Sequence, residues 1–147
     1  MIRNVFIFCC VLFFSSLAIT SQGAGQGEQD FERHTVRYST FNSTFVLPEI
    51  ARAYNIKRSK YESLLNVSVS ELGQYGSMPA RVEGTVTNLI QQQKMLTFQE
   101  IIEQNATYYL APLRIAGEET VHIELFVTPK GEDQPLRVKF TTKVYQD

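Results

Sequence analysis

Apolar and polar residues alternate along most of the chain from residue 31 onward. A period of two is typical of strands with one buried face, because successive side chains of a strand point to opposite sides. The alternation, with further segments near Leu96 and Tyr108, predicts about seven strands. The side chains that share one face of a strand are His34, Val36 and Tyr38; Leu65, Val67 and Val69; Val82, Gly84 and Val86; Val121, Ile123, Leu125 and Val127; and Leu136, Val138, Phe140 and Val144.

One segment has a different period. Leu47, Ile50, Ala51 and Tyr54 recur at helical spacing, and Pro48 suits the first turn of a helix. Asn55 tolerates the left-handed backbone that ends many helices. The pattern predicts one short helix after the first strand.

The strand pattern favours an all-β fold, an antiparallel immunoglobulin- or fibronectin-like β-sandwich, with a small antiparallel barrel as the alternative. A true immunoglobulin domain is not expected, because the chain has no tryptophan and its two cysteines are adjacent near the N-terminus. We expect residues 31–147 to form a single domain. Pro112 limits its strand to a sheet edge or a bulge, since proline cannot donate a ladder hydrogen bond.

The N-terminus has the order of a secretory signal. Arg3 precedes an apolar run that includes Cys9 and Cys10, and small or polar residues follow it. The apolar run is too short for a membrane-spanning helix. We therefore expect cleavage of residues 1–23, a flexible lead-in over 24–30, and a mature chain without cysteine or membrane span.

The candidate chemistry is sparse. A net charge of −1 and a pI near 6.1 argue against a nucleic-acid partner. His34 and His122 are too far apart for a local metal motif, no phosphate loop or nucleophile elbow occurs, and we interpret both histidines as surface residues. We predict no cofactor, metal or catalytic residue. Glu124 is expected opposite Lys139, as an ordinary cross-strand ion pair.

A basic segment around the predicted helix is the strongest candidate for a partner-binding patch. It consists of Arg52, Tyr54, Lys57, Arg58 and Lys60, in a chain that is otherwise slightly acidic. A solvated connection is the simpler interpretation, and a docking patch for an acidic partner, an anionic polysaccharide or a membrane surface is the other. The nearby Phe41, Phe45, Tyr54 and Tyr61 are expected to pack in the core or as a hydrophobic staple, with an aromatic groove as the alternative.

Three stretches are distinctive: residues 38–59 (YSTFNSTFVLPEIARAYNIKRS), 108–114 (YYLAPLR) and 140–147 (FTTKVYQD). Together they resemble the family of small exported bacterial proteins known as domain of unknown function four-four-two-six. The resemblance implies a Gram-negative host, export to the periplasm and a free-standing single domain. It supplies no activity and no catalytic or ligand residues.

These observations lead to three hypotheses about function. The first is a non-catalytic binding module for another envelope component, met through the basic segment or by strand addition at a sheet edge near Pro112. The second is a small-ligand carrier with an apolar pocket lined by Tyr and Phe. A hydrolase that uses carboxylates or His122 is the least favoured.

Overall fold

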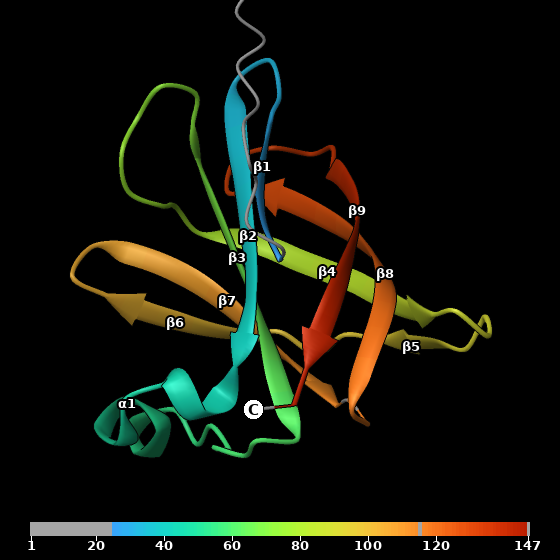
Figure 1. Ribbon diagram of the computed structural model, residues 1–147. Coiled ribbons are helices and arrows are strands. Elements are labelled where there is room, and N and C mark those ends of the chain that lie inside the picture. Colours follow the sequence, from blue (N-terminus) through green and yellow to red (C-terminus); the bar gives the residue numbers. More distant parts are fainter. Residues whose placement is uncertain (1–24, 115, 147) are drawn as a thin grey trace, which may run out of the picture.

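The computed structural model describes residues 25–114 and 116–146, which form two antiparallel β-sheets (Figure 1). Nine strands occur in these residues. The five-stranded sheet has the order β1 (Gln26–Asp30), β2 (His34–Asn42), β3 (Glu62–Glu71), β7 (Ala106–Arg114) and β6 (Gln99–Glu103). The four-stranded sheet has the order β5 (Gln93–Met95), β4 (Ala80–Asn88), β8 (Glu118–Pro129) and β9 (Leu136–Tyr145). The predicted β-sandwich is confirmed.

The core lies between the sheets and is built from the alternating side chains. In β3 the buried apolar residues include Leu65, Val67 and Val69, and in β8 they are Val121, Ile123, Leu125 and Val127. Each such side chain stabilises the fold by roughly 1.5–3 kcal/mol when fully buried.

A buried tyrosine joins the two sheets by hydrogen bonds. The Tyr109 hydroxyl of β7 donates to Glu100 Oε2 (2.9 Å) and accepts from the Ala80 backbone N–H of β4 (2.7 Å). Burial raises the pKa of Tyr109, and the opposing effect of the Ala80 N–H is smaller. The hydroxyl therefore stays protonated and available as a donor. A second link is the stack of Tyr38 on Phe140, whose ring centroids lie 3.8 Å apart.

The structure corrects the expectation of a flexible lead-in over residues 24–30. Residues Gln26–Asp30 form strand β1, which pairs with β2 in antiparallel register from Gln26 opposite Ser39 to Asp30 opposite Thr35. The strand is polar and mostly exposed, so it is held by backbone pairing with β2 and not by burial of apolar side chains. The predicted signal segment, residues 1–23, lies outside the described residues.

The predicted helix is present as α1 (Pro48–Ala53), preceded by the 3₁₀ turn η1 (Ser43–Phe45). Asn55 has a φ of 54°, the left-handed conformation expected at its end. The helix follows the second strand, because β1 precedes the strand that the sequence pattern placed first. In the described part of the chain no helix is long and apolar enough to cross a membrane.

Pro112 does not lie on an edge strand, since β7 stands between β3 and β6. It pairs with Leu64 of β3, but β6 pairs only with β7 residues 106–110. Pro112 thus occupies the part of β7 that extends beyond β6. A short open edge at this point accommodates its missing N–H donor.

Gly84 of β4 faces the core at a point where the neighbouring strand approaches closely. A Cβ atom there would lie 2.7 Å from the Glu124 carbonyl oxygen and 2.9 Å from Leu125 Cδ2. We expect Gly84→Ala to lower the free energy of unfolding by about 1–3 kcal/mol, because the backbone of β8 must shift. Urea unfolding measures this loss. Thr87→Ala on the outer face of β4 is the control, and an equal effect of both variants would contradict the steric explanation.

Candidate functional site

The predicted basic patch lies at one end of the sandwich, below the two sheets in Figure 1. We call this region the helical end and define it as residues 43–61 together with Tyr145 at the end of β9. It contains η1, α1 and the connection from α1 to β3. All five residues of the predicted patch, Arg52, Tyr54, Lys57, Arg58 and Lys60, belong to it.

Polar side chains fix the connection 54–61 against η1. Ser43 is fully buried, and its hydroxyl donates to the Ser59 carbonyl (2.9 Å) and accepts from the Ser59 N–H (2.8 Å). Asn42 caps η1 by accepting from the Thr44 N–H (2.9 Å), and its amide donates to the Lys60 carbonyl (3.0 Å). The backbone that carries the cations is therefore held in place by hydrogen bonds.

Tyr54 has a positioning role in this arrangement. Its hydroxyl donates to the Ile102 carbonyl of β6 (2.9 Å), and its own carbonyl accepts from Gln99 Nε2 (2.6 Å). These bonds attach the end of α1 to the edge strand of the five-stranded sheet. The structure thus gives Tyr54 a structural contact with β6, which the sequence did not predict.

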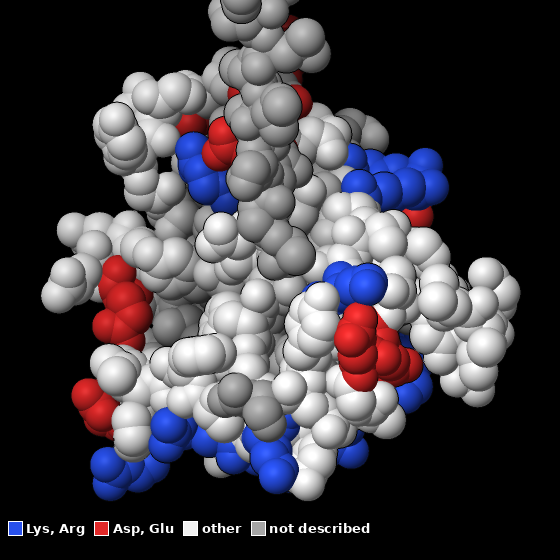
Figure 2. Space-filling view, viewed as in Figure 1, with Lys and Arg blue, Asp and Glu red and all other residues white. Residues whose placement is uncertain are grey.

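The four cations of the helical end are exposed and, among the described residues, form no ion pair. Arg58 Nη2 donates to the Thr44 carbonyl (2.8 Å), and Lys60 Nζ lies 5.2 Å from the centre of the Tyr61 ring. Figure 2 shows blue side chains along the lower end of the molecule, where Figure 1 places α1. Their charge is consequently available to a partner.

The sequence of the helical end contains few acids. Within residues 43–61 Glu49 of α1 is the one carboxylate, and its side chain is exposed. Glu62 follows at the start of β3, is largely buried, and lies 3.9 Å from Arg114 Nε. The helical end is therefore positive in a chain whose net charge is −1.

Aromatic side chains at the helical end are exposed, which corrects the expectation of core packing. Phe45 is 71% exposed and Tyr61 is 54% exposed, while Phe41 is half-buried. Phe45 lies in the turn η1, after the end of β2. Phe41, Phe45 and Tyr145 line a groove of about 190 Å³ beside Lys143. Sequence reasoning missed Tyr145, because nothing local connects it with Phe45.

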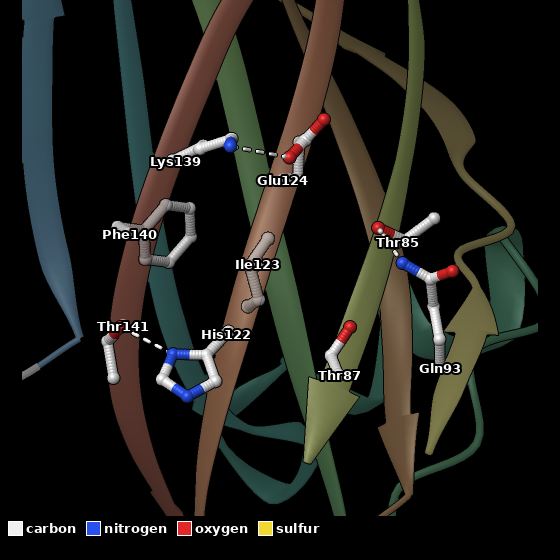
Figure 3. Close-up of a pocket in the computed structure, with 9 residues that line it drawn as sticks. All are labelled: Thr85, Thr87, Gln93, His122, Ile123, Glu124, Lys139, Phe140 and Thr141. Carbon is white, nitrogen blue, oxygen red and sulfur yellow. Dashed lines mark hydrogen bonds and ion pairs between the residues drawn. The ribbon is translucent and has the colours of Figure 1, made fainter. Parts of the chain in front are cut away.

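A second surface depression lies on the outer face of the four-stranded sheet (Figure 3). Its volume is about 320 Å³, and its polar lining comes from neighbouring strands. His122 of β8 is exposed, as predicted, and its Nδ1 lies 2.7 Å from the Thr141 hydroxyl oxygen of β9. The strand register also places Thr87 of β4 opposite His122.

Glu124 adjoins this depression and is held by two cations. Its carboxylate lies 3.1 Å from Arg137 Nη2 and 3.4 Å from Lys139 Nζ, which confirms the predicted pairing across the last hairpin. Partial burial alone would raise the pKa of Glu124, but hydrogen bonds from Lys139 and Arg137 outweigh it and lower this pKa. An ion-paired carboxylate with a lowered pKa is poorly suited to act as a general base near neutral pH.

The remaining sequence candidates do not converge on a reactive centre. His34 is 7% exposed at the start of β2, so its interpretation as a surface residue is wrong, and it shares the inner side with Val36 as the alternation indicated. In residues 25–114 and 116–146 no group of three His, Cys, Asp or Glu side chains could hold a metal ion.

The fold and the helical end define a two-sheet antiparallel sandwich with a basic, partly aromatic surface at one end. The family model for a domain of unknown function, DUF4426, matches residues 28–147, and the chain belongs to this family. A DUF4426 family protein from Pseudomonas aeruginosa PAO1, solved by crystallography, is similar to it. That structure has 32% sequence identity and a TM-score of 0.76, and the match covers 84% of this chain and 97% of the other.

More distant likeness is found to FetP of uropathogenic Escherichia coli strain F11. The as-isolated protein, expressed recombinantly in the periplasm, has 11% identity and a TM-score of 0.61 over 84% of this chain and 95% of that one. A copper-bound FetP variant has 10% identity and a TM-score of 0.59 over 84% and 92%. These identities show a shared fold alone. No match was found among curated proteins.

The ion pairs of Glu124 make part of the stability dependent on pH. Because the folded-state pKa of Glu124 lies below its ordinary value of 4.5, its contribution is present above that pH and is lost as the pH falls through the folded pKa. We expect Glu124→Gln to have a lower urea midpoint than wild type near pH 7. In strong acid, where Glu124 of the wild type is protonated, the two midpoints should be nearly equal. Glu83→Gln, on an exposed carboxylate of β4, is the control. A difference that is constant with pH would contradict this role of the Glu124 charge.

Proposed function

We propose that the chain is a non-catalytic binding protein of the periplasm that attaches to an anionic component of the cell envelope through its helical end. The observation that carries the proposal is the set of four exposed cations, Arg52, Lys57, Arg58 and Lys60, without ion-pair partners among the described residues. Of the other described cations, Arg33, Arg37, Arg114, Arg137, Lys139 and Lys143 are each paired with a carboxylate. Arg81, Lys94 and Lys130 are also unpaired, but they are separated on β4, on β5 and after β8. The helical end instead gathers four unpaired cations within nine positions of the chain, and such a cluster favours an external anionic partner.

The scaffold supports a binding role. Hydrogen bonds from Asn42 and Ser43 hold the connection 54–61, so little backbone freedom would be lost on association. The exposed rings of Phe45 and Tyr61 add apolar area beside the charges. A charged surface with adjoining aromatic groups combines long-range attraction with short-range contact.

The absence of an enzymatic role is part of the proposal. His122 contacts the Thr141 hydroxyl, and Glu124 is engaged by Arg137 and Lys139. Within residues 25–114 and 116–146, no carboxylate bonds to the imidazole as in a hydrolytic triad. We do not transfer the copper of the FetP variant to this chain, because likeness at 10% identity concerns the fold.

The alternative of a small-ligand carrier has less support. It requires an apolar pocket lined by aromatic residues, and the groove of this kind, with Phe41, Phe45 and Tyr145, holds about 190 Å³. Pockets for small ligands usually measure about 300–1,000 Å³. The groove suits contact with a surface better than enclosure of a ligand.

Periplasmic location rests on the sequence of residues 1–23, which has the charged, apolar and small segments of a cleaved signal. The likeness to FetP, which was expressed in the periplasm of Escherichia coli, accords with it. Strand addition beside Pro112 is a second possible mode of attachment, since β7 extends beyond β6 there.

Co-sedimentation with an envelope preparation tests the proposal. The preparation contains both membranes and the cell wall, and the protein is recovered after export. We expect wild type to sediment with it at low salt and to be released at high salt, because exposed charges are screened. The double variant Lys57→Glu/Lys60→Glu should lose most of this binding.

The matched control is Lys94→Glu/Lys130→Glu. It makes the same change in net charge at two exposed lysines outside the helical end. Equal binding of the two double variants, or no sedimentation of wild type, would overturn the proposed function.

A further inference from the structure

We propose that the anionic component is the phosphate-bearing surface of a lipid bilayer, onto which the helical end docks with its cations at the headgroups and its exposed apolar side chains in the interface. This inference rests on the proposed function and specifies its partner.

Apolar side chains stand in water around the cations. Phe45 is 71% exposed, Leu47 60%, Tyr61 54% and Tyr145 49%. Phe45 and Tyr145 line one groove. Leu47 follows Phe45 by two residues, and Tyr61 ends the connection from α1 to β3. Aromatic and Leu side chains next to Lys and Arg are the combination found where proteins meet the headgroup region of a bilayer.

The lysines of the helical end suit the phosphates of lipid headgroups, which move relative to one another. Lys57 and Lys60 carry compact ammonium groups on flexible stems. Residues 43–61 contain four cations and the single carboxylate of Glu49. Each basic side chain near an anionic bilayer strengthens binding by roughly fivefold. This electrostatic attraction does not require a fixed geometry between each cation and a phosphate.

The shape of the surface favours a bilayer over an acidic protein. Phe45 and Leu47 are largely exposed, and the groove that Phe45 helps to line is small, at about 190 Å³. A protein partner is usually recognised by anchors that fill pockets and by forked Arg–carboxylate pairs. A bilayer interface admits protruding side chains and places no demand on their shape.

The docking differs from that of an amphipathic helix. The six residues of α1 are too few to present a long apolar face. Contact would instead use side chains from η1, the connection and β9, on a backbone held by the Ser43–Ser59 hydrogen bonds. The surface is thus already formed before it meets the membrane.

Sedimentation with protein-free vesicles tests the inference, using the protein recovered after export with its N-terminus determined by mass spectrometry. One set of vesicles contains roughly one-third phosphatidylglycerol in phosphatidylethanolamine, and the other contains phosphatidylcholine alone. We expect binding to the anionic set and little to the neutral set. Lys57→Glu/Lys60→Glu should weaken binding by about twentyfold or more, since two favourable charges are lost and two unfavourable ones are added.

The apolar part of the contact is tested by Phe45→Ser/Leu47→Ser, which should weaken binding about tenfold. Its matched control is Leu89→Ser/Ile90→Ser in the β4–β5 loop, where the two side chains are 64% and 74% exposed. Urea unfolding verifies that each variant is folded. A loss of binding in the loop variant with retention in the Phe45/Leu47 variant would overturn the inference, as would equal binding to neutral vesicles.

The two proposals fail differently. Sedimentation with envelope fragments but not with anionic vesicles, still dependent on Lys57 and Lys60, would overturn the bilayer inference and leave the proposed function standing, with a protein or polysaccharide as the partner. Absence of binding in both experiments would overturn both.

Discussion

The apolar contact between the two sheets is the interaction on which the rest of the structure depends. Leu65 and Val67 of β3 and Leu125 and Val127 of β8 belong to one buried cluster, and their sheets share no covalent link because the described residues contain no cysteine. Burial of alternate side chains must therefore hold the two sheets together, and the Tyr109 hydroxyl adds a hydrogen bond between them. The ends of these strands position every surface feature, including the helical end.

Features that rest on local periodicity could be predicted from the sequence. Alternation in β3, β8 and β9 identified the inner face, and helical spacing with Pro48 and Asn55 located α1. Strand β1 could not be predicted in this way, because Gln26–Asp30 is almost wholly polar and is held by backbone bonds to β2. Likewise, the sequence could not show that β6 ends before Pro112 and leaves this part of the central strand β7 with an open edge.

The candidate site was predictable in charge but not in shape. Arg52, Lys57, Arg58 and Lys60 are visible as a cluster along the chain, whereas their lack of internal partners depends on which acids the fold brings near. The groove joins Phe45 to Tyr145, residues from distant parts of the sequence. Phe45 belongs to the η1 turn, which strand and helix periodicity do not predict. Tyr54 is predicted both in the patch and among the packed rings, and the structure shows its hydroxyl bound to the Ile102 carbonyl of β6.

The two hydrogen bonds between Ser43 and Ser59 hold the backbone of the helical end without using its charged side chains. Both bonds use the backbone of Ser59, and Asn42 likewise binds the carbonyl of Lys60 rather than its ammonium group. The outward side chains of this connection are thus free to vary during evolution without disturbing the path of the main chain. Descendants of a common ancestor can retain one scaffold while diverging in the surfaces to which they adhere.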